Sequence, residues 1–332
     1  MLVFDVFVVQ SKGAGISGAS VTCGEVAAMP QYLNLQPRFD RSDPTHATDD
    51  PREVDRQRPL REAIDVPARK IISIADDYRA APREEKSHLA ACLARAIVHS
   101  ARNHALEGAD SPTDQFYRSW IILQVAIAYL KAQPEIDEIE ESVEIREWFQ
   151  RNATALMEFQ ARGVEVAGRN NHYFWNGIAV LAVGLVIEDE ALVDYAREVR
   201  DAGLSDISSD GLLALEMQRG HLALHYHIFA AEALAGLMLL HPDPVLPWQS
   251  SAIRRLTNAI IESIADLSGG PIASSAEVEQ SPPKRLVPLH VLVPFLDVGS
   301  PEWEIIQDII KDVPPHSRYL GGNLQFVLCR PQ

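Results

Sequence analysis

Two short segments gather the side chains that could perform chemistry. The first, GRNNHYFWNG at 168–177, places two amides, a histidine and aromatic rings directly before a long apolar run. The second, RGHLALHYH at 219–227, holds an arginine, a tyrosine and three histidines. The first segment is either an unusually polar helix cap or one wall of a pocket, and its own residues do not decide between these interpretations.

The spacing in the second segment indicates how its side chains are grouped. If the segment is helical, Arg219 and Tyr226 lie about two turns apart and share a face, so the guanidinium and the phenol point into the same space. His221 and His225 lie at i and i+4 on a neighbouring face, a spacing that can chelate zinc. Because no H-E-x-x-H pattern or third ligand accompanies them, we predict no metal site. Hydrogen bonds in the core are the alternative role for these histidines.

An arginine and a tyrosine on one face suit the removal of a weakly acidic proton beside a carboxylate. In a uronic acid, loss of the C5 proton creates an enediolate-like dianion, so the carboxylate charge must be neutralised first. An arginine does this with a bidentate hydrogen bond, to which an amide or imidazole adds donors. A tyrosine can then take the C5 proton if nearby positive charge lowers its pKa, and can return the proton to the departing O4 oxygen. This chemistry needs no metal and no cofactor.

The two segments resemble a pair of motifs from one enzyme family. NNHYFW at 170–175 is similar to the N-N-H-x-Y-W motif of the alginate lyase family, polysaccharide lyase family 5. LALEMQRGHLALHYH at 213–227 resembles the second motif of that family, in which an arginine and a tyrosine lie seven residues apart. The interval between the motifs also matches, and such paired motifs are more specific than either motif by itself.

The resemblance implies roles for four residues and an activity for the chain. Asn171, His172 and Arg219 would bind and neutralise a carboxylate, and Tyr226 would be general base and acid, with the histidine sharing the base role for one substrate epimer. The implied activity is metal-independent β-elimination in a β-1,4-linked polyuronate, with poly-mannuronate (alginate) favoured, giving 4,5-unsaturated oligosaccharides. The implied fold is all-α, an incomplete (α/α) toroid of antiparallel helical hairpins with a deep cleft.

Weaker similarity extends from about Cys23 to the end of the chain. It suggests that Cys23 and Cys92 form a disulfide, and hence a periplasmic or secreted location. It also suggests a set of substrate-binding residues, namely Arg38 in a lid-like loop, Gln115 and Arg118 in QFYRSW, Trp175, and Arg318 in SRYLGGN. The sequence departs from the family at Phe39, where the lid has a tyrosine, and an aromatic residue, Tyr319, is added before the paired glycines.

The elements that must position these residues are mostly helices. Apolar residues at i, i+3 and i+4 recur from residue 68 onward, with few stretches of period two, which indicates an all-α array of helical hairpins. No exact repeat period supports a regular solenoid. The Pro- and Asp-rich segment before these helices predicts a long surface loop with frayed helix, lid-like over about 36–62. We expect one domain over 23–332, and an N-terminal extension or degenerate signal segment over 1–22.

Composition limits the partners. The 332 residues carry a formal net charge of −16, which argues against binding of nucleic acid through a whole-surface field but permits a locally basic site. We find no apolar run of the length that spans a bilayer, so no membrane partner is predicted. The expected partner is an anionic polysaccharide, and the expected state is a monomer.

Three alternatives to an alginate lyase remain open. The same mechanism can act on glucuronan or hyaluronan. A protein with this fold can also bind polyuronates without turning them over. A hydrolase that uses paired carboxylates is a third possibility, although no carboxylate pair stands out near either motif.

Overall fold

The computed structural model describes residues 23–40, 42–43, 45, 48–242 and 250–328. The predicted extension over 1–22 lies outside these residues. The α-helices run over Pro51–Ala80 (α1), Arg83–Arg102 (α2), Pro112–Lys131 (α3), Gln133–Ile136 (α4), Ser142–Ala167 (α5), Asn171–Ile187 (α6), Glu190–Asp206 (α7), Ala214–Met217 (α8), Ala223–Leu240 (α9), Ser251–Ala265 (α10), Pro271–Ala276 (α11), Pro301–Ile310 (α12) and Gln325–Leu328 (α13). Shorter elements are the 3-10 helices Gly220–Leu222 (η2), Val287–Val291 (η4) and Val293–Phe295 (η5), and the antiparallel strands His316–Ser317 (β1) and Gly322–Asn323 (β2).

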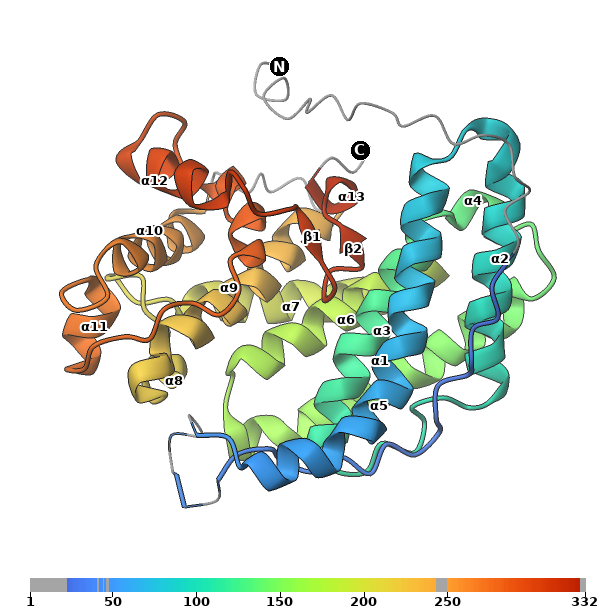
Figure 1. Cartoon of the computed structure of the whole chain (residues 1–332), viewed down its shortest axis with the longest axis horizontal. Helices are drawn as coiled ribbons and strands as arrows, with labels where there is room; N and C mark the ends of the chain where they lie inside the picture. The colour runs from blue at the N-terminus through green and yellow to red at the C-terminus, as the bar shows by residue number, and fades with distance from the viewer. Residues whose placement is uncertain (1–22, 41, 44, 46–47, 243–249, 329–332) are drawn as a thin grey trace.

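The helices form an incomplete (α/α) toroid, as the sequence predicted. Figure 1 shows them curving around an open ring, with α1 and α2 at one end and α10 to α12 at the other. Helices α3, α5, α7 and α9 all pack against α6, which makes α6 the central element of the ring. The short β1–β2 hairpin lies on this ring beside α1 and η4.

The central helices α6 and α9 are apolar on nearly every side, which is typical of helices buried in a core. One consequence corrects the expectation that no segment is long and apolar enough to span a bilayer. Gly220–Leu240 meets that requirement by length and composition, yet 78% of its most apolar 18-residue window is buried inside the protein. We therefore interpret it as the core helix of the ring.

The predicted lid-like loop over 36–62 is only half loop, because α1 already begins at Pro51. The helix starts there because the Asp50 side chain caps it, accepting a hydrogen bond from the Arg52 amide at 2.9 Å, and because proline suits the first helical turn. The remaining loop is closed on itself by a backbone bridge between Phe39 and Asp49. From here on, "the lid" means the residues of 38–50 that the structure describes, namely 38–40, 42, 43, 45 and 48–50.

The predicted disulfide between Cys23 and Cys92 is present. It ties the first described residues to α2 across a sequence separation of 69, which by loop-closure entropy stabilises the fold by about 4 kcal/mol. Beyond the disulfide, the extended segment continues along the α2–α3 turn, where the Leu106 and Gly108 amides donate to the Pro30 and Gln31 carbonyls at 3.0 Å. Each end of this N-terminal segment is therefore fixed before the lid begins.

Candidate active site

Asn171 is the first residue of α6 and is fully buried. Its backbone amide donates to Glu216 Oε1 at 2.7 Å, and its Nδ2 lies 3.1 Å from both Glu216 oxygens. The buried Glu216 thus orients the amide, while Asn171 Oδ1 is buried without a hydrogen-bond partner. Because the free atom is an acceptor, it can receive a hydrogen bond from a hydroxyl or a protonated carboxyl, whereas neutralising a carboxylate requires another residue.

Glu216 is a site residue that sequence reasoning missed. Burial raises the pKa of its carboxyl, and the hydrogen bonds from Asn171 and the charge of Arg219 act in the opposite direction. The only signal in the sequence is an acid three residues before Arg219 in the second motif. An acid at the edge of an apolar run is usually exposed, so this signal does not distinguish a buried partner from a surface charge.

His172 follows on the same helix start and lies among aromatic rings. Its imidazole stacks on Phe116 with ring centroids 3.6 Å apart and planes 6° apart, and Trp120 lies at 6.0 Å. Burial and the nearby positive charge of Arg219 lower the pKa of His172 to about 3. The imidazole is therefore neutral at physiological pH. Its Nδ1 is buried without a hydrogen-bond partner.

Arg219 and Tyr226 do meet, although they do not belong to one continuous helix. Helix α8 ends at Met217, and Gly220, with φ of +54°, breaks the helix before η2 and α9. The Arg219 guanidinium carbon lies 4.8 Å from the centre of the Tyr226 ring, and its Nε is buried without a partner. The prediction that the two groups share one space is correct, but its premise of an unbroken helix is wrong, since a glycine with positive φ cannot continue a helix.

His227 holds this broken segment against α9. Its Nε2 accepts a hydrogen bond from the Leu213 amide at 3.0 Å, and its Nδ1 donates to the Ala223 carbonyl at 2.8 Å. His227 is fully buried, and burial lowers its pKa to about 4. The alternative that the histidines form core hydrogen bonds is thus correct for His227. Among the residues that the structure describes, the single group with ligand atoms close enough for a metal ion is Cys23, His88 and Cys92, of which both cysteines are in the disulfide.

The protonation state of Tyr226 differs from the expectation. The cations Arg219 and Arg38 do lower the pKa of its phenol, but burial, the larger effect, raises it above the ordinary value. The tyrosine is 9% exposed. In the absence of a ligand it is therefore a neutral phenol, which can donate a proton without prior ionisation.

The lid lies beside this group. Thr45 Cγ2 is 3.8 Å from the position that a Cβ on Gly220 would occupy, and Arg38 lies close enough to lower the pKa of both Tyr226 and His225. The Arg38 guanidinium is paired with Asp49 of the same lid at 3.0 Å. Arg38 is thus placed where a bound anion at Tyr226 could contact it.

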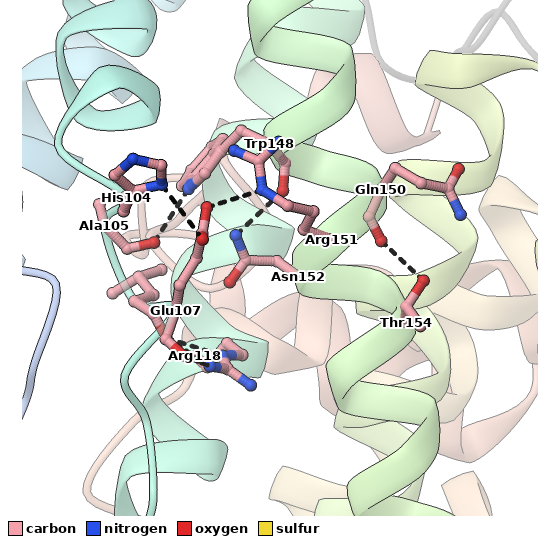
Figure 2. Close-up of polar contacts among 10 residues, drawn as sticks. His104, Ala105, Glu107, Arg118, Trp148, Gln150, Arg151, Asn152 and Thr154 are labelled. Carbon is pink, nitrogen blue, oxygen red and sulfur yellow. Dashed lines mark hydrogen bonds and ion pairs between the residues drawn. The ribbon is translucent and has the colours of Figure 1, made fainter.

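Gln115 and Arg118, predicted to bind substrate, face the other way. Arg118 is 2% exposed and donates to the Leu106 and Glu107 carbonyls and to Gln115 Oε1 at 2.5 to 3.0 Å. Gln115 Nε2 donates to the Ala109 carbonyl. Figure 2 shows the Arg118 guanidinium below Glu107, in the network that fastens the α2–α3 turn. Gln115 and Arg118 thus lie on the face of α3 that points away from the site. The QFYRSW pattern does not indicate which side of the helix lines the site.

The opposite face of α3 contributes to a group of half-buried rings, which we call the aromatic cluster. Its members are Phe116, Tyr117, Trp120, His172, Phe229 and Tyr319. Trp175, predicted to contact substrate, lies behind this cluster, 4.9 Å from Phe229 and 5.3 Å from Tyr319. Its exposure is 0%, so it supports the rings and cannot stack on a sugar.

Cations surround the aromatic cluster, although the chain as a whole is acidic. The guanidinium carbons of Arg285 and Arg318 lie 4.7 and 4.8 Å from the Tyr319 ring centre, and Arg61 lies 5.6 Å from that of Tyr117. Burial is the largest cause of the low pKa of His225, about 4, and the positive charges of Lys284, Arg285 and Arg38 lower it further. Sequence reasoning found Arg38 and Arg318 but missed the others. They come from segments without a motif, and nothing local in the sequence brings them together.

The fold and this site together define a toroidal all-α protein with a local concentration of positive charge beside an arginine–tyrosine pair. A sequence model described as alginate lyase matches residues 90–243 of the chain. This matched range contains Asn171, His172, Arg219 and Tyr226.

Individual proteins with related names are similar to the chain over a longer range. A polysaccharide lyase of Stenotrophomonas maltophilia is 33% identical over 214 residues, which is 63% of this chain and 61% of the relative. An alginate lyase of Pseudomonas syringae is 22% identical over 242 residues, or 70% of this chain and 64% of the relative. The chain thus spans less than two thirds of the length of each of these relatives.

Solved structures establish the fold over nearly the whole chain. Alginate lyase A1-III from Sphingomonas species A1 superposes with a TM-score of 0.69 at 16% identity, covering 95% of this chain and 88% of that one. A histidine-to-alanine variant of A1-III in complex with a tetrasaccharide gives a TM-score of 0.72 at 17% identity, covering 96% and 89%. At this level of identity, the likeness concerns the fold.

Proposed function

We propose that the protein is a polysaccharide lyase that cleaves β-1,4-linked polyuronates, with poly-mannuronate favoured, by metal-independent β-elimination. The observation that carries this proposal is the stacking of the Arg219 guanidinium on the Tyr226 ring beside neutral His172. This arrangement places a group that pairs with carboxylates next to one that transfers protons. The names of the relatives, alginate lyase and polysaccharide lyase, support the same reaction.

Binding begins with charge and stacking. Arg61, Arg285 and Arg318 lie against rings of the aromatic cluster, and Arg38 lies near Tyr226; these cations would attract successive carboxylates of a polyuronate. The half-buried rings would pack against the apolar faces of the sugars. Because the chain as a whole is acidic, these arginines are the groups through which it would attract a polyanion. The tetrasaccharide bound to the A1-III variant supports an oligosaccharide ligand for this fold.

The chemistry then follows from the roles of four residues. Arg219 pairs with the carboxylate of the sugar whose C5–H bond breaks, and so stabilises the charge that develops on it. Asn171 Oδ1 accepts a hydrogen bond from that sugar. The ionised form of Tyr226 takes the C5 proton as a base, and the phenol that results returns this proton to O4 as the C4–O4 bond breaks and the C4=C5 double bond forms. His172, neutral at rest, shares the base role for the opposite epimer.

The proposal is tested by mixing the purified chain with poly-mannuronate, poly-guluronate, glucuronan and hyaluronan. A lyase generates ultraviolet absorbance from the C4=C5 double bond, most rapidly on poly-mannuronate. Absence of absorbance with all four polymers would contradict the proposal. A shift in polymer mobility without absorbance would then indicate a binding protein, and reducing ends without absorbance would indicate a hydrolase. Faster reaction with glucuronan or hyaluronan would keep the mechanism but change the substrate.

The pH dependence of kcat/KM is expected to identify the base. Burial raises the pKa of Tyr226 above its ordinary value near 10, so the fraction of ionised Tyr226 grows about tenfold per pH unit through the neutral range. If Tyr226 is the base, activity on poly-mannuronate rises from pH 7 to pH 9 with a slope near one. With His172 as base, whose pKa is about 3, activity would already be flat above about pH 5. A flat profile would therefore move the base role to His172.

The location of the protein also belongs to the proposal. We place it in the periplasm or outside the cell, because disulfides such as Cys23–Cys92 persist in oxidising compartments. We further propose that residues 23–332 act as a single domain and as a monomer, without a cofactor.

A further inference from the structure

The β1–β2 hairpin and its turn, residues 316–323, bring Arg318 and Tyr319 to the site. Tyr319 lies 5.6 Å from both Trp120 and Phe229 in the aromatic cluster, and Arg318 donates a hydrogen bond to its hydroxyl at 3.0 Å. Each strand has only two residues, too few to hold a hairpin in place by pairing. Contacts from other elements must therefore determine where these two side chains lie.

The first anchor of the hairpin is a charged pair beneath it. Lys131, the last residue of α3, has a side chain with 0% exposure; it forms an ion pair with Asp76 of α1 and donates to the Gly321 carbonyl at 2.5 Å. Asp76 in turn accepts a hydrogen bond from the Asn323 amide at 3.1 Å. A Cβ at Gly322, where φ is +103°, would lie 2.3 Å from Asp76 Oδ2, so this close approach requires glycine.

The second anchor lies at the other side of the turn. Ser317 Oγ donates to Glu232 Oε1 at 2.7 Å, and Glu232 is fully buried on α9. Arg285 lies 3.6 Å from the second oxygen of Glu232 and also stacks on Tyr319. The turn is thus held from α1 and α3 on one side and from α9 on the other.

We propose that the Lys131–Asp76 pair is a positioning device for substrate binding, which holds the turn so that Arg318 and Tyr319 face the polymer. This inference rests on the proposed function. Lys131 has no exposed side-chain atoms and therefore cannot touch a polymer itself. Burying an ion pair costs free energy of desolvation that a pair of apolar side chains would avoid. We therefore infer that the two charges are there to orient the groups that they contact. Here they fix a backbone carbonyl and a backbone amide of the turn that carries Arg318 and Tyr319.

The test compares Lys131→Met, which keeps the length of the side chain and removes its charge, with Ile260→Ala. Ile260 is fully buried on α10, which does not pack closely against the hairpin, so this control weakens the core without touching the turn. Amide hydrogen exchange of residues 320–323 and steady-state kinetics on poly-mannuronate are measured for both. For Lys131→Met we expect exchange about tenfold faster and a KM about tenfold higher, with kcat within about twofold. Ile260→Ala should lower Tm and leave exchange at 320–323 and KM unchanged.

A double variant separates positioning from general weakening. In the Lys131→Met background, Arg318→Ala should raise KM much less than it does in the wild type, because Arg318 is already misplaced. A folded Lys131→Met protein with wild-type exchange and KM, or full additivity with Arg318→Ala, would overturn the proposal. If Lys131→Met does not fold, Asp76→Asn provides the same comparison while keeping an acceptor for the Asn323 amide. If the wild type shows no lyase activity, the proposed function is refuted. If Lys131→Met then still exchanges faster at 320–323, the role of Lys131 in anchoring the turn stands.

Discussion

Replacing Tyr226 with phenylalanine is expected to reduce kcat on poly-mannuronate by about 10³-fold or more while leaving polymer binding nearly unchanged. General acid and base steps each contribute roughly 10² to 10⁴, and the proposed mechanism assigns both proton transfers to this one hydroxyl. The ring itself remains, so its contact with the Arg219 guanidinium and its place in the core are kept. The measurements are ultraviolet absorbance for turnover and calorimetry with a mannuronate oligomer for binding.

Tyr195→Phe is the matched control for this variant. The Tyr195 hydroxyl donates to Asn176 Oδ1 at 3.2 Å, between α7 and α6, away from the arginine–tyrosine pair. Its loss should cost stability but leave kcat within about twofold. If Tyr226→Phe keeps more than a tenth of wild-type turnover, both proton transfers belong to another residue, and His172 becomes the first candidate.

Arg219→Met is expected to lower kcat/KM by about 10² to 10³-fold, because Arg219 is the cation that stacks on Tyr226 in the part of the chain that the structure describes. The guanidinium is the group that would neutralise the carboxylate, a role that Asn171 cannot take while its Nδ2 is bound to Glu216. The same substitution should raise the pKa of His172, since the positive charge of Arg219 contributes to lowering it. Kinetics measure the first effect, and titration of the imidazole by NMR measures the second.

Arg169→Met serves as the control for charge removal near the first motif. Arg169 forms an exposed pair with Asp206 and stacks on no ring of the aromatic cluster. Its loss should leave both kcat/KM and the pKa of His172 nearly unchanged, because exposed pairs contribute little. Equal losses from the two substitutions would show that net charge, rather than the position of Arg219, supports catalysis.

Apolar periodicity alone predicted an all-α array of helical hairpins, whereas the toroid and the disulfide were implied by the family resemblance of the two polar segments. Paired motifs at a fixed interval identify a family far more specifically than single residues do, and the disulfide followed from that resemblance. The approach of Arg219 to Tyr226 was also predicted, although Gly220 interrupts the helix on which that prediction rested. Arg219 still meets Tyr226 despite the interruption of the helix, because its long side chain places the guanidinium over the tyrosine ring.

Tertiary packing decided the features that the sequence could not. QFYRSW places residues on every side of α3, and only the neighbouring α2–α3 turn makes Arg118 a buried support instead of a substrate contact. Trp175 likewise became core because Phe229 and Tyr319, distant in sequence, cover it. The pKa of Tyr226 depends on a balance between burial and charge that no local pattern contains.

The anchoring of the C-terminal hairpin has a consequence for the order of folding. Lys131 and Gly321 are 190 residues apart in sequence, and Asp76 and Asn323 are 247 apart. Contacts at such separations close large loops and generally form late, after local helical hairpins have assembled. We therefore expect the ring to collapse first as an inactive intermediate, with the catalytic motifs already folded. Full affinity for a polymer would appear only when the last turn of the chain docks.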